Sequence, residues 1–325
     1  MKTQRKTIDF INAVCASKTK KLVGKERLRR MVESDSLQVA FEILRESAFG
    51  GDISLSYREY EKLIENEELL LCEFVKEYAP SDELESFCLI SYDFYNALAI
   101  LKSKFAKMDY KDYVQTEGLY SIEDLNNLVE NGKGTVFPKE LIKAVENGKV
   151  LLENGGGGMS VGALFVRAKF DFLKRITKQK YLKELLDLKI DGINLNICLR
   201  AGDIELARSQ IINGGSLNSV QISALVKKDK DAIDTLFKGH WLYFVAKNGV
   251  DCLLNGKPPV DLEREISSVE ADILSGSRFT QTDGTFPFTL YYFKRKNEIA
   301  CVRTVLTGKS NGLDSEQIKR RLITV

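Results

Sequence analysis

The sequence predicts an all-α protein built from similar helical units. Apolar residues recur at helical spacing, as Phe94, Leu98 and Leu101 do in one predicted helix. The 325 residues include only five prolines, and proline interrupts helices because it lacks a backbone N–H. Few segments alternate apolar and polar residues as a half-buried strand does. The clearest predicted helices cover 82–108, 167–189 and 261–274.

An internal repeat predicts how these helices are grouped. Four segments recur at a constant spacing of 97 residues, at 22–34, 119–131, 216–228 and 313–325. Each contains an apolar pair, namely Met31-Val32, Leu128-Val129, Leu225-Val226 and Leu322-Ile323. Ser121 and Ser315 occupy one position of the repeat and resemble helix N-caps.

A second repeated segment begins with an acid, at Asp93, Asp191 and, less regularly, Glu298. Asn96 and Asn194 follow three residues after the first two acids, whereas Cys301 follows the third. Polar side chains inside helical repeats usually fix packing. We therefore expect both asparagines to form hydrogen bonds between helices, a structural role rather than a catalytic one.

The repeats predict three helical units, at 1–118, 119–215 and 216–325. Because 313–325 copies the first repeated segment, we expect it to form a helix that packs beside the first unit. Ile318 and Leu322, four residues apart, should face that surface. Three basic neighbours should point mostly outward, namely Lys319, Arg320 and Arg321.

Charge is concentrated at the two ends of the chain. The net charge is +2, yet residues 1–30 carry +8 and residues 294–325 carry +5, which leaves −11 for the middle. This asymmetry can mark a contact with anionic partners, but from charge alone we favour two solvated helical ends. Carboxylate pairs such as Glu67-Glu68 stand in charged helical surroundings, so we expect them on solvated faces.

Cysteine and histidine usage predicts no metal site and no cofactor. The six cysteines form no CxxC pair, and His240 is the only histidine. The cysteines are expected to be reduced and packed as small apolar residues in a cytoplasmic protein. No signal peptide is recognisable, and no apolar stretch approaches the roughly 20 residues of a membrane span.

No motif predicts catalytic residues. The "TGKS" at 307–310 resembles the end of a phosphate-binding loop, but Arg303 occupies the position where that loop needs glycine. The "GGGGMS" at 155–160 lacks a following lysine and reads as a loop. His240, beside Trp241, has no evident nucleophile to activate. We therefore predict no catalysis and no intrinsic nucleotide binding.

The segment 294–323 resembles the C-terminal signature of the C subunit of V-type and A-type ATPases, the homologue of the d subunit in the eukaryotic V-ATPase. The resemblance rests on Glu298, Arg303, the Gly308-Lys309 pair and the Gly312-Leu313 pair. The segments 25–44, 93–104 and 191–201 resemble other parts of the family. The N-terminal helix departs from the family because it lacks an alternating arginine-rich pattern.

The resemblance implies a funnel of three similar domains with pseudo-threefold symmetry and no catalytic residues. It implies a peripheral protein on the cytoplasmic face of the membrane. Its partners would be the rotor shaft, made of the D and F subunits, and the proteolipid ring in the membrane. It would pass torque between shaft and ring during ATP hydrolysis or synthesis.

Three other functions remain as alternatives at this point. An unrelated α-helical repeat scaffold for protein–protein interaction would share every fold signal except the 294–323 signature. A nucleic-acid-binding protein would use the basic ends, although their lysines and arginines lack interleaved aromatic residues. An enzyme would need a constellation that no motif supplies. The sequence does not indicate whether the ion would be H⁺ or Na⁺.

Overall fold

A computed structural model describes residues 5–51, 54–116, 118–132, 136–257, 262–276 and 284–322. Within these residues every regular element is a helix and no strand occurs. The predicted all-α fold class is therefore confirmed. No described helix combines the length and the apolarity that crossing a membrane requires.

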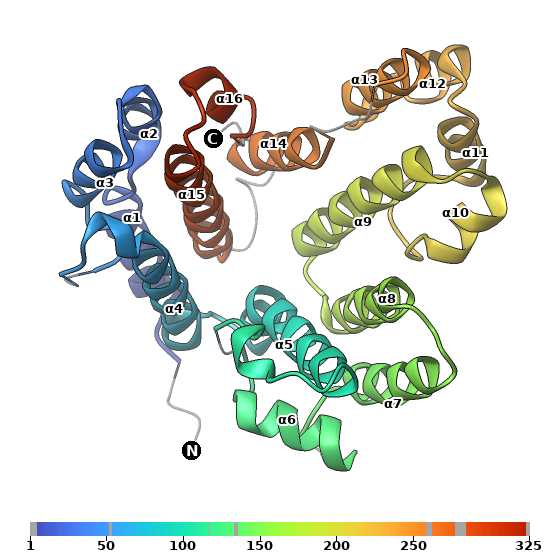
Figure 1. Ribbon diagram of the computed structural model, residues 1–325, viewed down its shortest axis with the longest axis horizontal. Helices are drawn as coiled ribbons and strands as arrows, with labels where there is room; N and C mark the ends of the chain where they lie inside the picture. The colour runs from blue at the N-terminus through green and yellow to red at the C-terminus, as the bar shows by residue number, and fades with distance from the viewer. Residues whose placement is uncertain are drawn as a thin grey trace. The chain divides into compact units, whose positions relative to one another are not determined.

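The α-helices are labelled in chain order in Figure 1. Their bounds are α1 (Ile8–Thr19), α2 (Gly24–Glu33), α3 (Leu37–Arg45), η1 (Tyr57–Glu59), α4 (Tyr60–Tyr78), α5 (Asp82–Phe105), η2 (Tyr110–Asp112), α6 (Ile122–Asn131), α7 (Lys139–Glu153), α8 (Gly158–Ile176), α9 (Lys180–Arg200), α10 (Ile204–Gln210), α11 (Ser219–Lys227), α12 (Lys230–Leu236), α13 (Tyr243–Leu254), α14 (Leu262–Ser275), α15 (Phe286–Ser310) and α16 (Ser315–Lys319).

The chain forms two compact units. The smaller unit comprises residues 72–186, and the larger unit comprises residues 1–71 together with 187–325. The first part of the chain thus packs with the last part. The three repeat units, with boundaries at 118/119 and 215/216, stay a prediction.

In the smaller unit, α5 packs against α6, α7 and α8. A glycine permits the close approach of α7: a Cβ atom at Gly148 would lie 2.8 Å from the Leu101 side chain and 3.2 Å from Phe165. Leu101 and Phe165 are themselves buried. Larger side chains at position 148 would separate α5, α7 and α8.

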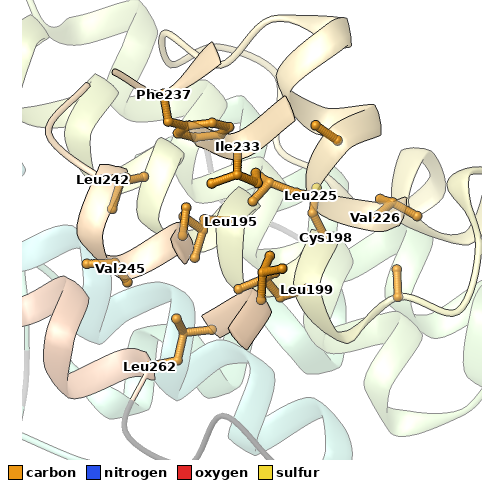
Figure 2. Packing of buried hydrophobic residues seen from close by; sticks show 14 of the residues in the cluster. Leu195, Cys198, Leu199, Leu225, Val226, Ile233, Phe237, Leu242, Val245 and Leu262 are labelled. Atoms are coloured by element: carbon orange, nitrogen blue, oxygen red, sulfur yellow. The ribbon is translucent and has the colours of Figure 1, made fainter. Parts of the chain in front are cut away.

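The larger unit contains an apolar cluster built from the end of α9 through the start of α14. Figure 2 shows Leu195, Leu199 and Phe237 among the buried side chains of this cluster. Burying an aliphatic or aromatic side chain contributes about 1.5–3 kcal/mol relative to exposure. These contacts hold the short helices α10 to α13, which are too brief to be stable alone.

Elsewhere in the larger unit, α15 packs against α1, α2, α3, α14 and α16, and its label in Figure 1 lies among theirs. Buried residues occur all around α15, which is typical of a central helix. Its first turn contains Pro287, a position where the missing N–H breaks no helical hydrogen bond. Helix α15 is therefore the element on which both ends of the chain assemble.

Candidate functional site: a repeated polar clamp and the junction of the chain ends

Buried acids on the long helices hold the beginnings of other helices. On α5, Asp93 is fully buried, and its two carboxylate oxygens accept hydrogen bonds from the backbone N–H groups of Leu119 (3.0 Å) and Tyr120 (3.1 Å). Gly118 lets the backbone approach this closely, because a Cβ atom there would lie 2.6 Å from the carboxylate. The acid thereby fixes the chain that leads into α6.

The same arrangement recurs on α9, 98 residues later. The buried Asp191 accepts hydrogen bonds from the N–H groups of Ser216 (2.7 Å) and Leu217 (3.1 Å), and from the Ser216 hydroxyl (2.5 Å). A Cβ atom at Gly215 would lie 2.2 Å from this carboxylate, and Gly215 also has a positive φ of 78°. Substituting this glycine would both strain the backbone and displace the acid.

We call each buried aspartate, together with the asparagine three residues after it, a clamp: Asp93 and Asn96 form the first, and Asp191 and Asn194 form the second. The hydrogen-bond partners of the two asparagines differ from those predicted. Asn96 accepts from the N–H of Gln115 (2.8 Å) and donates to the carbonyl of Thr116 (3.3 Å). Asn194 accepts from the N–H of Ile212 (2.8 Å) and donates to its carbonyl (2.9 Å). The predicted bonds between helices are therefore wrong, because both amides bind the backbone of the following connection. Irregular backbone needs such partners when it is buried.

Because Asp93 is buried, its contribution to the stability of the fold depends on pH. Burial raises the pKa of Asp93 to about 7, because the two backbone donors offset desolvation only in part. Relative to an unfolded aspartate, the folded protein then binds an extra proton between about pH 4 and 7, so the contribution of this group to stability falls as pH rises through that window. An Asp93→Asn variant should lose this component, on the order of 3–4 kcal/mol over the window.

Urea unfolding of wild type and Asp93→Asn at pH 4.5, 6 and 7.5 would measure the difference. The expected result is that wild type loses stability relative to the variant at each step upward in pH. Parallel pH profiles for the two proteins would show that Asp93 does not titrate in this window.

The third copy keeps the acid and joins distant parts of the chain. On α15 the buried Glu298 accepts a hydrogen bond from the N–H of Gly24 (3.1 Å), 274 residues away. Gly24 is the first residue of α2. In the other two copies, the residues that Asp93 and Asp191 bind likewise lie just before a helix, α6 and α11 respectively. Cys301 stands where the other copies have asparagine, and it is buried. The third acid thus connects α15 with the N-terminal part of the chain.

Glu298 belongs to a buried ionic network. Arg295, on the same helix, lies 2.5 Å from Glu298 and 2.6 Å from Glu67 on α4. The second oxygen of Glu67 accepts a hydrogen bond from the N–H of Gly50 (2.6 Å). The guanidinium also lies over the ring of Phe49, 5.1 Å from its centroid. Each charge therefore has several polar partners, as burial of charge requires.

Burial and the charged partners together set the pKa values of Arg295 and Glu298. Burial alone would lower the pKa of Arg295, but the carboxylates of Glu67 and Glu298 outweigh it and hold the pKa above its usual value. Burial raises the pKa of Glu298, and Arg295 offsets this only in part. The prediction that Glu67 and Glu68 lie on a solvated face is wrong for Glu67, which is 4% exposed.

A second junction attaches the C-terminal segment to α2. The Lys309 ammonium donates to the carbonyl of Ser34 (2.5 Å), and the Ser315 hydroxyl donates to the carbonyl of Val32 (2.7 Å). Ile318 is completely buried, and a Cβ atom at Gly308 would lie 2.7 Å from its side chain. The C-terminal segment therefore contacts both α15 and the end of α2.

The predicted helix over 313–325 is shorter in the structure. Helix α16 covers Ser315–Lys319, and residues 323–325 lie outside the described residues. The predicted burial of Ile318 is confirmed, whereas Leu322 is only half-buried. The three basic residues are exposed as predicted, namely Lys319, Arg320 and Arg321.

The two predicted serine caps differ in outcome. Ser121 caps α6, because its hydroxyl accepts the N–H of Asp124 at 3.0 Å. Ser315 is not a cap: Asp314 takes that position and forms a capping box with Gln317. The carboxylate at 314 satisfies the N-terminal N–H group, which leaves the Ser315 hydroxyl free to bind α2.

The lone histidine lies beside the second clamp in an arrangement unlike that of a nucleophilic enzyme. The N–H of Leu242 donates to Nδ1 of His240 (3.1 Å), so the neutral ring carries its proton on Nε2, 3.0 Å from the Ser216 hydroxyl. Ser216 in turn donates to Asp191. Burial lowers the pKa of His240, which favours this neutral ring. The serine proton thus points to the carboxylate, and the ring offers it no basic nitrogen.

The remaining motifs occupy ordinary helical positions. Gly308 and Lys309 lie within α15, and Arg303 pairs with Glu68 at 3.1 Å. Gly158 begins α8, so the glycine-rich segment is partly the start of a helix rather than only a loop. The absence of intrinsic nucleotide binding stays a prediction, which a measurable ATP affinity that is lost in Lys309→Ala would contradict.

The cysteines are packed as predicted: all six are free, and five are buried. Burial raises the pKa of Cys15 and Cys198 to about 11, which keeps both in the thiol form. Among the described residues, no group of three or more His, Cys, Asp and Glu side chains is placed to hold a metal ion. The absence of catalytic and cofactor residues stays a prediction.

The fold and the buried polar contacts together define a class of protein: an all-helical chain in which buried polar groups fix several connections, including one between α15 and the start of α2. The chain belongs to the family of the ATP synthase (C/AC39) subunit, whose model matches residues 11–321. It is similar to the C subunit of the V-type sodium ATPase of Enterococcus hirae, with 22% identity over 327 residues, which cover 96% of this chain and 97% of the relative. It is also similar to the C subunit of the A-type ATP synthase of Archaeoglobus fulgidus, with 22% identity over 207 residues, 62% of this chain and 57% of the relative.

Proposed function

We propose that the chain is a non-catalytic central-stalk subunit of a V-type rotary ATPase or synthase. It would couple the rotor shaft, made of the D and F subunits, to the proteolipid ring on the cytoplasmic face of the membrane. The observation that carries the proposal is the family match over residues 11–321. The same match argues against the alternative of an unrelated helical scaffold.

The buried junctions support a mechanical role. A protein that passes torque must resist deformation, and closely packed helices with satisfied polar contacts are stiff. Here α15 is tied to α4 through Arg295 and Glu67 and to the start of α2 through Glu298. Lys309 and Ser315 add bonds to the end of α2. Force applied near one end of the chain would therefore reach the other end through bonded contacts.

The three predicted repeat units, at 1–118, 119–215 and 216–325, fit the same function. We infer that the third copy of the acid makes the closing contact of the series, because Glu298 holds Gly24 as Asp93 holds Leu119. Three similar units closed in this way would give the pseudo-threefold funnel that the family resemblance implies. Superposition of the three units in an experimental structure of the assembled complex would test this arrangement.

Purification of the tagged full chain from its native host tests the function. The expected result is that the D and F subunits of the shaft and the ring proteolipid co-purify in detergent and are identified by mass spectrometry. A tagged chain that is abundant and folded, yet brings down no other component of the ATPase, would contradict the proposal.

A further inference from the structure

A small open cavity lies beside the C-terminal half of α5, within the smaller compact unit. Its volume is about 310 Å³, near the lower end for a binding pocket. Three large side chains on its rim are about half exposed: Tyr95 (45%), Met108 (51%) and Tyr113 (43%). Its lining is mostly apolar and includes Tyr95, Leu98, Ala99, Lys102, Met108 and Tyr113.

Hydrogen bonds order the backbone on two sides of the cavity. The N–H of Met108 donates to the carbonyl of Ser103 (2.8 Å), while Lys107 takes a left-handed φ of 56° that turns the chain at the end of α5. Further along, the Asn96 amide binds Gln115 and Thr116, next to the rim residue Tyr113. The bonds of Asn96 therefore order the stretch of chain that follows the lining residue Tyr113.

Among the lining residues, Lys102 alone carries a charge. None of the described residues forms a hydrogen bond or an ion pair with its ammonium group. It lies beside the first turn of α8: a Cβ atom at Gly158 would be 3.7 Å from it, and one at Gly162 would be 3.8 Å away. Unpaired N–H groups at a helix start and a nearby lysine both favour a carboxylate.

The internal repeat allows Lys102 to be compared with the corresponding residue of the second copy. Arg200 on α9 stands 98 residues after Lys102, and it pairs with Glu263 at 3.5 Å in the first turn of α14. The first turn of α8, the Gly158–Gly162 stretch, contains no acid. The basic residue of the second copy, Arg200, thus has a carboxylate partner within the chain, whereas the first turn of α8 offers none to Lys102.

We propose that the cavity binds a segment of a neighbouring protein of the ATPase complex, one that carries an apolar side chain next to a carboxylate. The inference rests on the proposed function, since it requires the chain to be part of that complex. The apolar side chain enters between Tyr95, Met108 and Tyr113, and the carboxylate takes the place on Lys102 that Glu263 takes on Arg200. A preformed pocket loses little conformational freedom on binding, which favours affinity.

Photo-crosslinking identifies the occupant. Tyr95 is replaced by p-benzoylphenylalanine in the full chain, and the native complex is purified and irradiated. The expected product joins this chain to a peptide of another protein of the ATPase complex, in which an Asp or Glu adjoins an apolar residue. Crosslinks only to lipid, only to a second copy of this chain, only within this chain, or to nothing would overturn the proposal.

Binding of variants separates this proposal from the proposed function. The full-length chain is added to detergent-extracted ATPase that lacks it, and its Kd is measured by biolayer interferometry. Lys102→Glu and Ala99→Phe, which reverse the charge and fill the cavity, should each weaken binding about tenfold or more. The matched control is Lys143→Glu, an exposed lysine on α7, which should bind as wild type does.

The outcomes are distinguishable. No binding of wild type contradicts the proposed function, and with it this inference. Tight binding of wild type that both cavity variants retain overturns the inference alone. Circular dichroism of each variant confirms that its helices are intact, so weaker binding reports on the cavity.

Discussion

Replacing Arg295 by methionine should lower the free energy of unfolding by about 3–5 kcal/mol, because the buried carboxylates of Glu67 and Glu298 would then face each other without a cation. Total stability is usually about 5–15 kcal/mol, so this one change removes a large part of it. Urea unfolding followed by circular dichroism measures the effect. The bond from Gly24 to Glu298 suggests that α2 loosens first, which hydrogen exchange of its amides would reveal.

The same helix supplies a matched control. Arg303 also pairs with a glutamate of α4, Glu68, at 3.1 Å, but its side chain is 41% exposed. Exposed pairs contribute little, so Arg303→Met should cost less than about 1 kcal/mol. Equal losses in Arg295→Met and Arg303→Met would show that burial does not set the strength of these pairs. A double-mutant cycle with Glu67→Gln isolates the coupling between Arg295 and Glu67.

The sequence alone predicts the helical class and the repeated segments, but it predicts the polar contacts less well. The acids around Glu67 in the sequence favour a solvated face, whereas the structure buries its side chain. Its spacing from Leu63, Ile64 and Leu71 places it on the buried stripe of α4, and this signal could have identified it. The many acidic residues around Glu67 drew attention away from the helical spacing of the apolar residues on α4.

The repeat predicted one contact between distant parts of the chain, the packing of 313–325 beside the first unit. The other such contacts could not be predicted because no local rule determines them. The bond between Glu298 and Gly24 spans 274 residues, and the repeat only hints at it through the shared acid position. The partners of the two asparagines escape prediction for a similar reason. An asparagine on a helix has the same sequence pattern whether its amide binds another helix or a buried connection. Only the path of the chain after α5 and α9 determines which of these partners the amide meets.

Removal of residues 313–325 should be as damaging as loss of Arg295. It deletes Ile318, whose burial alone contributes about 1.5–3 kcal/mol, and it exposes the surface around Gly308 that this side chain covers. It also removes the bond from Ser315 to Val32, which contributes about 0.5–1.5 kcal/mol. The truncated chain should therefore unfold at a lower temperature and at a lower urea concentration, with α2 less protected from hydrogen exchange.

The control keeps the segment and changes only its charge. Alanine at Lys319, Arg320 and Arg321 should leave stability within about 1 kcal/mol of wild type, since all three are exposed and exposed charges contribute little. If these residues also contact an acidic partner in the complex, the triple variant should assemble less well, and the defect should depend on salt concentration. A truncated chain that melts at the wild-type temperature would show that the contact between α16 and α2 does not stabilise the junction of the chain ends.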